Sequence, residues 1–154
     1  KYPHSQLMTH GEHVGLPDGV MGNSEVGHTT LGAGQVLFQS LARIHRSIRD
    51  RSFFQHPELK AFLTGSGRVH ALGLLSDAGV HSDLRHLLAF LEMARDAKVE
   101  HLSVHAILDG RDTPPDSGVG YLEQLLHHPL WVTRPKGWLL ASLSGRYFTM
   151  DRDQ

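Results

Sequence analysis

Apolar residues in the second half of the chain gather into three short runs, each followed by a polar loop. The runs cover residues 68–75, 102–108 and 139–143, and each is short and apolar enough for a buried strand. Helix-like periodicity follows the first two loops. Strand, polar loop and helix in alternation predict an α/β fold with a mostly parallel sheet.

Helices are expected wherever apolar residues recur every three or four positions. They cover residues 36–48, 57–63, 83–97 and 118–127. In the first of them the apolar residues share one face and leave Arg43, Arg46 and Arg49 toward solvent. The second begins at Pro57, a favoured first helical position. The third is capped by Ser82 or Asp83.

A glycine-rich segment, residues 15–34, precedes these elements and is expected to be a loop. Ser24 lies in it between Gly22 and Gly27. Glycines let a backbone approach a ligand closely, and freed amides in such loops cradle anions. The Ser24 hydroxyl is therefore a candidate nucleophile or phosphate contact. The alternative is an ordinary surface turn with a capping serine.

Residues 22–29, GNSEVGHT, also have the spacing of a nucleotide-binding P-loop. His28 occupies the lysine position, and imidazole cannot replace the long cationic side chain that reaches the phosphates. Pro17 and Gly19 interrupt the buried strand that should come before the loop. The P-loop interpretation is therefore weak.

Charged residues concentrate in the loops that follow the three predicted strands. Because ligands bind beyond the carboxyl ends of parallel strands, these loops predict one site. Arginines with a carboxylate suit a small anionic substrate. The alternative is a set of surface ion pairs of little energetic value. The candidate residues are His81, Asp109, Arg111, Asp112, Arg146 and Arg152.

Composition restricts the remaining function classes. The chain is 40% hydrophobic and 20% charged, with a formal net charge of −1, which gives no electrostatic case for nucleic acid or an anionic membrane. It has no cysteine, so disulfides and thiolate metal sites are excluded. No apolar run approaches the roughly 20 residues of a membrane span. A cytoplasmic location is expected.

Four motifs carry a resemblance to a known family. MGNSEVGH around Ser24, GVHSD at residues 79–83, LDGRDTPP at 108–115 and SGRYFTMDRD at 144–153 follow one another in order. Together they resemble the cofactor-independent (2,3-bisphosphoglycerate-independent) phosphoglycerate mutases. One departure is Ala78, which stands where the family has a glycine.

The resemblance implies an isomerase that interconverts 2-phosphoglycerate and 3-phosphoglycerate through a phosphoserine, in glycolysis and gluconeogenesis. Ser24 would be the catalytic nucleophile and a metal ligand, and Asp112 a plausible proton carrier. Two divalent ions, manganese in most members, would be the cofactors. The residues that would bind the phosphoglycerate are His81, Arg111, Asp112, Arg146 and Arg152.

The resemblance also implies an internal fragment of a two-domain enzyme of the alkaline-phosphatase superfamily. Residues 1–38 would be part of the metal-binding phosphatase domain and residues 39–154 part of the substrate-binding transferase domain. The other metal ligands would lie outside the chain, so the fragment alone is expected to be inactive. The full-length enzyme would be a monomer with a small-molecule substrate and no nucleic-acid or membrane partner.

Two other functions remain open at the level of sequence. One is a metal-dependent phosphatase of the same superfamily, although simple hydrolysis does not need the arginines that retain the glycerate. The other is a non-catalytic anion-binding module built on the glycine-rich segment.

Overall fold

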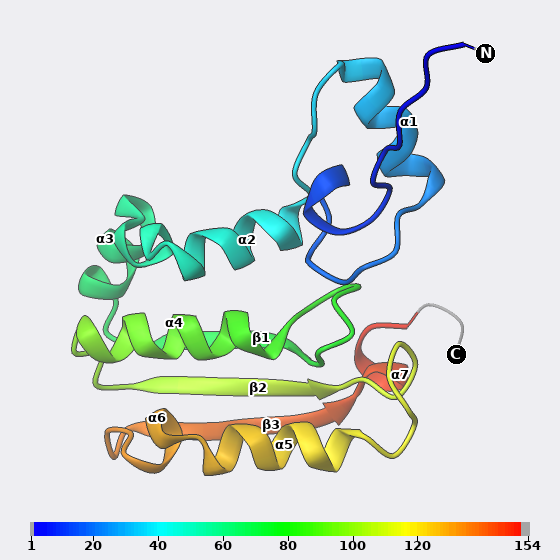
Figure 1. Ribbon diagram of the computed structural model, residues 1–154. Coiled ribbons are helices and arrows are strands. Elements are labelled where there is room, and N and C mark those ends of the chain that lie inside the picture. Colours follow the sequence, from blue (N-terminus) through cyan, green and yellow to red (C-terminus); the bar gives the residue numbers. More distant parts are fainter. Residues whose placement is uncertain (1, 152–154) are drawn as a thin grey trace. The chain divides into compact units, whose positions relative to one another are not determined.

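A computed structural model describes residues 2–151 (Figure 1). The chain divides into two compact units, Lys1–Asp50 and Arg51–Gln154. The predicted boundary after residue 38 concerns the domains of a longer protein and stays a prediction.

The second unit is built on a parallel sheet of three strands. They are β1 (Val69–Leu75), β2 (Leu102–Leu108) and β3 (Trp138–Gly145), in the order β1-β2-β3. Both pairings are parallel. The predicted strands and their parallel arrangement are confirmed, and β3 extends beyond the predicted run at both ends. The carboxyl ends of all three strands therefore lie at one edge.

Two crossover helices connect the strands, as the periodicity predicts. α4 (Leu84–Asp96) begins after Asp83, whose side chain accepts a hydrogen bond from the amide of Arg85 at 2.9 Å. α5 (Gly118–His127) leads to α6 (Pro129–Val132), a single turn that the sequence did not predict. In Figure 1, α4 lies in front of β1 and α5 in front of β3. Right-handed crossovers that step in one direction place both helices on one face.

The core lies between this face of the sheet and the helices. Val69, Leu102 and Trp138 pair across the three strands and are buried. The Trp138 indole Nε1 donates to the Val99 carbonyl at 2.7 Å, so this large aromatic is buried without an unpaired polar atom.

The opposite face of the sheet carries a polar row. His70 Nδ1 lies 2.9 Å from His105 Nε2, and His105 Nδ1 lies 2.9 Å from the Ser142 hydroxyl. Leu72, next to this row, is 72% exposed. This face is therefore more polar and more accessible than the face under α4 and α5.

Gly137, just before β3, gives a test of the strand packing. A Cβ there would lie 2.2 Å from the Glu100 carbonyl oxygen, so Gly137→Ala forces the backbone apart. We expect a loss of about 1–3 kcal/mol in unfolding free energy, measured by denaturant titration. Gly120→Ala is the matched control, because nothing lies within 4 Å of that Cβ and alanine favours the helix by up to about 1 kcal/mol. Equal stability of the two variants would contradict the expectation.

The rest of the second unit consists of short elements. A 3-10 turn at Ser52–Gln55 precedes α3 (Pro57–Gly65), which confirms the helix predicted from Pro57. α7 (Arg146–Thr149) follows β3 directly. The sequence predicted a loop there. One turn forms because the Arg146 carbonyl accepts from the amides of Met150 and Asp151 at 2.8 and 2.9 Å.

The first unit contains a 3-10 turn at Gly11–Val14, α1 (Ser24–Ala33) and α2 (Ser40–Arg49). The prediction of a loop throughout residues 15–34 is wrong for α1. The helix forms because the Asn23 side chain caps it, accepting from the amide of Val26 at 3.1 Å. Val26 then packs in a small core with Val14 and Leu16.

α2 begins later than its apolar pattern predicts. Gln39 is extended, and its amide donates to the Gly15 carbonyl at 2.8 Å, which holds the chain out of a helix until Ser40. Gly15 has φ 81°, and a Cβ there would lie 2.2 Å from the Leu37 carbonyl oxygen. The predicted solvent exposure of Arg43, Arg46 and Arg49 is confirmed.

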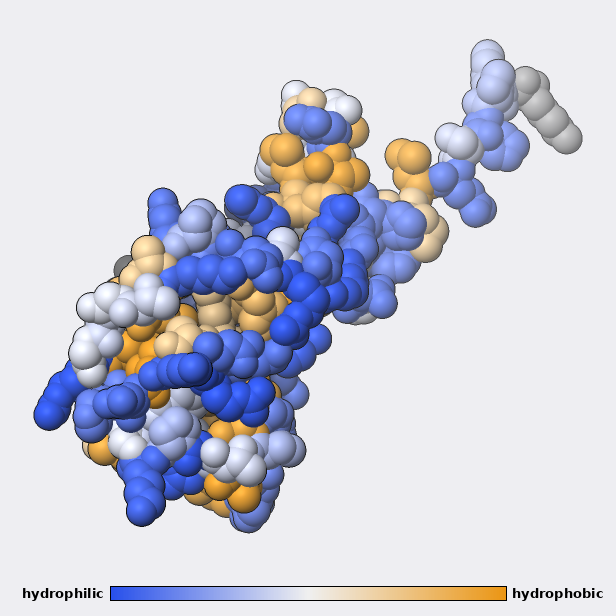
Figure 2. All heavy atoms as spheres, turned by 90° about the vertical axis from the view of Figure 1, so that its left-hand side faces the viewer, coloured by the Kyte–Doolittle hydropathy of each residue, from blue (hydrophilic) through white to orange (hydrophobic). Residues whose placement is uncertain are grey.

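The surface is mixed in character. Figure 2 shows apolar residues in patches between hydrophilic ones on one side of the molecule. Among the helices in the described part of the chain, none has the length and apolar content needed to cross a bilayer.

Candidate active site

Ser24 is the first residue of α1, and its side chain is exposed. Thr9, His10, Gly22 and Asn23 line the same open depression. Gly22 is required there, because a Cβ would lie 1.9 Å from the Thr9 carbonyl oxygen. Because Ser24 is the first residue of α1, its hydroxyl lies at the positive end of the helix dipole. That position favours a negatively charged group.

His28 lies one turn further along α1, but it is not arranged as a base for Ser24. Its Nδ1 lies 2.8 Å from the Ser24 carbonyl oxygen and 3.2 Å from the Ser24 hydroxyl. A carbonyl only accepts, so the shorter contact requires Nδ1 to carry the proton. That nitrogen is then unavailable to take a proton from Ser24.

The segment before Ser24 also bears on the P-loop alternative. It contains the 3-10 turn Gly11–Val14 and an isolated antiparallel bridge between His10 and Met21. A P-loop follows directly from a buried strand. This unit has no such strand among its described residues, which agrees with the weakness of the P-loop match.

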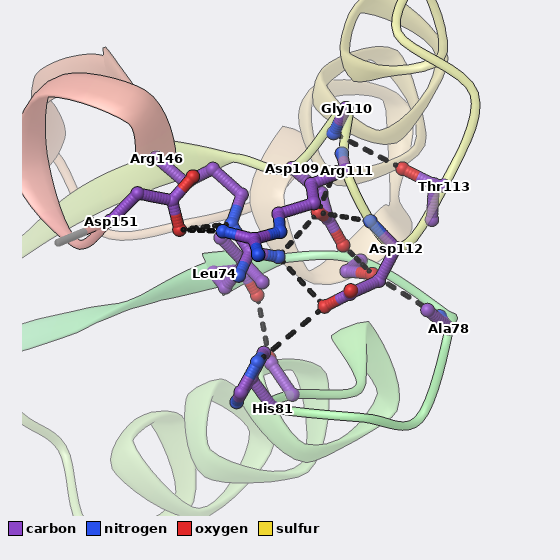
Figure 3. Close-up of polar contacts among 12 residues, drawn as sticks. Leu74, Ala78, His81, Asp109, Gly110, Arg111, Asp112, Thr113, Arg146 and Asp151 are labelled. Atoms are coloured by element: carbon purple, nitrogen blue, oxygen red, sulfur yellow. Dashed lines mark hydrogen bonds and ion pairs between the residues drawn. The ribbon is translucent and has the colours of Figure 1, made fainter. Parts of the chain in front are cut away.

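The loops after the three strands meet in the second unit, as predicted (Figure 3). Arg146, from the end of β3, is at the centre with its side chain 5% exposed. Its Nη1 donates to Asp109 at 2.8 Å and to Asp112 at 2.7 Å, and its Nε donates to Asp151 at 3.0 Å. These hydrogen bonds, those to Asp109 and Asp112 first, raise the pKa of Arg146 above its ordinary value.

Asp109, at the end of β2, is the most enclosed acid of the group, with its side chain 0% exposed. Burial acts to raise its pKa, but hydrogen bonds from Ser76, Arg146 and the amides of Asp112 and Arg111 outweigh burial and lower the pKa to about 2. The carboxylate is therefore ionised throughout the neutral pH range.

His81 and Arg111 form the accessible part of the cluster. His81 Nε2 lies 3.6 Å from Asp112 Oδ2, and the His81 side chain is 47% exposed. Arg111 Nη1 lies 3.5 Å from Asp151 Oδ1, and the Arg111 side chain is 58% exposed. Both contacts are loose enough for an incoming anion to replace them.

The structure thus brings together four of the predicted substrate-binding residues: His81, Arg111, Asp112 and Arg146. Arg152 lies outside the described residues. Ser24 belongs to the first unit and is not part of this cluster.

Sequence reasoning missed four residues in or next to the cluster: Ser76, Asp77, Tyr121 and Asp151. Ser76 donates to Asp109 at 2.7 Å, and Asp151 pairs with Arg146. Tyr121 on α5 donates to Asp77, in the loop that carries His81, and this bond raises the pKa of Tyr121 to about 12. Ser76 and Asp77 directly follow β1, so the rule that selected the other loops could have found them.

The expected metal centre can be compared with the metal-ligating side chains that the described residues provide. Among residues 2–151, no group of three or more His, Cys, Asp or Glu side chains is arranged to hold a metal ion. Ser24 offers a single oxygen. These residues do not by themselves fit a two-metal centre.

Known proteins resemble the chain in sequence and in structure. The family model described as BPG-independent PGAM N-terminus matches residues 44–154. Two relatives named 2,3-bisphosphoglycerate-independent phosphoglycerate mutase, from Syntrophotalea carbinolica and Akkermansia muciniphila, are 48% and 49% identical over 99% of the chain. The chain spans 30% and 29% of their lengths.

A solved structure agrees with these matches. It is a Leishmania mexicana phosphoglycerate mutase studied at low cobalt concentration, with a TM-score of 0.75 and 36% sequence identity. The similarity covers 94% of this chain and 28% of that one. The chain therefore belongs to the family described as the N-terminal region of the 2,3-bisphosphoglycerate-independent phosphoglycerate mutases.

Proposed function

We propose that the chain is the corresponding part of a longer 2,3-bisphosphoglycerate-independent phosphoglycerate mutase. That enzyme would interconvert 2-phosphoglycerate and 3-phosphoglycerate through a phosphoserine at Ser24, as a step of glycolysis and gluconeogenesis. The observation that carries the proposal is the convergence of His81, Arg111, Asp112 and Arg146 from three strand ends in a member of this family.

The two exposed residues of the cluster, Arg111 and His81, would make the first contacts with the phosphoglycerate. Arg146 is more constrained, since its Nε and both N–H groups of Nη1 already bond carboxylates. Its Nη2 would be the nitrogen that reaches a substrate oxygen. A guanidinium whose Nε and Nη1 are fixed by carboxylates and whose Nη2 is left to donate is suited to orienting a carboxylate or phosphate.

Asp112 would exchange the proton of the substrate hydroxyl. Its side chain is 19% exposed and lies 2.7 Å from Arg146 Nη1. A partly accessible carboxylate beside the bound glycerate is a suitable proton carrier. Arg152 would add a further substrate contact.

Ser24 would accept the phosphoryl group. Its position at the N-terminus of a ten-residue helix supports this role, because the helix dipole stabilises a phosphate there. A serine hydroxyl is a weak nucleophile near neutral pH and needs activation. The protonated Nδ1 of His28 does not supply it.

We propose two divalent metal ions, manganese first among them, as the activating cofactors. Ser24 is the ligand that this chain would contribute, and the remaining ligands would come from the rest of the longer protein. The 154-residue chain alone is therefore expected to be inactive.

The organisation of the longer enzyme is part of the proposal. Residues 1–38 would belong to its phosphatase domain and residues 39–154 to its transferase domain. We place the enzyme in the cytoplasm, as a monomer acting on a small-molecule substrate.

The test is conversion of 3-phosphoglycerate to 2-phosphoglycerate by the full-length protein without added 2,3-bisphosphoglycerate. We expect turnover that a chelator removes and manganese restores. The 154-residue chain, assayed in parallel, should show none. Release of free phosphate in place of 2-phosphoglycerate would indicate a phosphatase, and turnover by the short chain would contradict the proposed division of metal ligands.

A further inference from the structure

Asp109 stands out because it is buried in the cluster but has no predicted contact with the substrate. Its Oδ2 accepts from the Ser76 hydroxyl at 2.7 Å, and its Oδ1 accepts from Arg146 Nη1 at 2.8 Å. The same Oδ1 accepts from the amides of Arg111 and Asp112, each at 3.1 Å. With its side chain 0% exposed, this carboxylate cannot meet a ligand without a rearrangement of the cluster.

The four donors come from all three strand ends. Ser76 follows β1, Arg111 and Asp112 follow β2, and Arg146 follows β3. One carboxylate therefore fixes the relative positions of loops that are far apart in the sequence. In Figure 3, Asp109 and Asp112 both lie to the right of the Arg146 guanidinium, and a dashed line joins Asp112 to His81.

The contacts to Arg146 leave its orientation little freedom. Asp109 and Asp112 share Nη1, and Asp151 takes Nε. Asp109 is the most enclosed of these acids, since Asp112 and Asp151 are 19% and 11% exposed. A buried charged hydrogen bond holds its partner more firmly than one open to water.

We propose that Asp109 is a positioning residue, which fixes Arg146 and the 110–112 loop in the orientation that binds phosphoglycerate. This rests on the proposed mutase function. The effect is indirect: Asp109 sets the direction of Nη2 and the placement of Arg111 and Asp112, and it does not itself touch the substrate.

A purely structural role is the competing explanation, and Asp83 provides the comparison. Asp83 has a side chain that is 1% exposed, and it pairs with Arg85 at 2.6 Å. It also caps α4. Asp83→Asn thus perturbs an acid in the same unit that is about as buried as Asp109 but pairs with the exposed Arg85 instead of Arg146.

The experiment compares Asp109→Asn, Asp109→Glu and Ser76→Ala with Asp83→Asn in the full-length protein. Asparagine keeps the shape of Asp109 but removes the charge opposite Arg146. We expect Asp109→Asn to raise KM for 3-phosphoglycerate by about tenfold or more, with a smaller effect on kcat. Asp109→Glu, which keeps the charge but shifts it, should recover part of the loss. Asp83→Asn should lower Tm and leave KM within about twofold.

Ser76→Ala keeps the test decisive if Asp109→Asn does not fold, because it leaves Asp109 in place. It removes the hydrogen bond to Oδ2 and the one that the Ser76 hydroxyl accepts from the amide of Ala78 at 3.1 Å. A KM raised about threefold or more by Ser76→Ala supports the positioning role, because losing a hydrogen bond to an ionised carboxylate should have at least that effect. A KM equal to wild type in every folded variant, with only Tm lowered, overturns it.

Calorimetric binding of 3-phosphoglycerate separates this inference from the proposed function. If the wild type binds 3-phosphoglycerate but shows no mutase turnover, the proposed function fails. The positioning role is then judged by the dissociation constant, which Asp109→Asn should raise. Absence of binding to the wild type overturns both.

Discussion

Replacing Ser24 with alanine in the full-length protein is expected to remove mutase turnover. With the hydroxyl gone, no oxygen at this position can accept the phosphoryl group, and the rate should fall by at least about 10⁴-fold. The helix should be intact, because Asn23 provides the cap and alanine is a good residue in a first helical turn. The measurement is 2-phosphoglycerate formation in the presence of manganese, with far-UV circular dichroism as the check on folding.

Thr29→Ala is the matched control for this variant. Thr29 lies in the same helix, and its hydroxyl donates to the Glu25 carbonyl at 2.7 Å, so its loss removes a hydroxyl without touching Ser24. This control should retain wild-type turnover. A phosphorylated Ser24 should also be detectable by mass spectrometry in wild type after brief exposure to substrate. Persistence of turnover in Ser24→Ala would disprove the nucleophile assignment.

Replacing Arg146 has the second largest expected effect, and two substitutions separate its roles. Arg146→Met leaves Asp109, Asp112 and Asp151 without their shared cation. Because a broken buried pair strands charge in the interior, we expect about 3–5 kcal/mol less unfolding free energy. Arg146→Lys keeps a charge but cannot reproduce the planar fork that bonds three carboxylates. We expect kcat/KM for the lysine variant to fall by about 10²-fold or more.

Arg85→Met is the control for the stability measurement. Arg85 pairs with the single carboxylate of Asp83, and its side chain is 67% exposed. Such a pair contributes up to about 1 kcal/mol. Urea unfolding of the three variants measures the difference. If Arg146→Met costs no more than Arg85→Met, the buried ion pairs do not stabilise the unit. If Arg146→Lys is fully active, the guanidinium fork does not orient the substrate.

The sequence determined the architecture of the second unit. Short apolar runs separated by helical periodicity predicted all three strands and both crossover helices. The parallel arrangement then followed from the alternation of strand and helix. Because parallel strands end at one edge, the sequence also predicted that His81, Arg111, Asp112 and Arg146 would meet. These inferences depend on local patterns and on a general rule of topology.

In the first unit local patterns were less reliable. Glycine density suggested a loop at residues 24–33, but a capping Asn23 and the burial of Val26 produced α1. The late start of α2 depends on a hydrogen bond between Gln39 and Gly15. The Asn23 cap is a local signal that periodicity does not register, whereas the burial of Val26 and the Gln39–Gly15 hydrogen bond depend on residues farther along the chain.

Only the tertiary structure decided the roles of the acids around Arg146. Asp109 and Asp112 reach it across 37 and 34 positions of sequence. The register of the three strands and the depth at which each side chain lies decide that Asp109 is enclosed and that Asp112 is accessible. The sequence therefore predicted that four polar residues of these loops would meet. Tertiary packing decided that three carboxylates hold Arg146 and that Asp109 is buried against it. Burial and pairing between residues so far apart in the sequence depend on the assembled sheet.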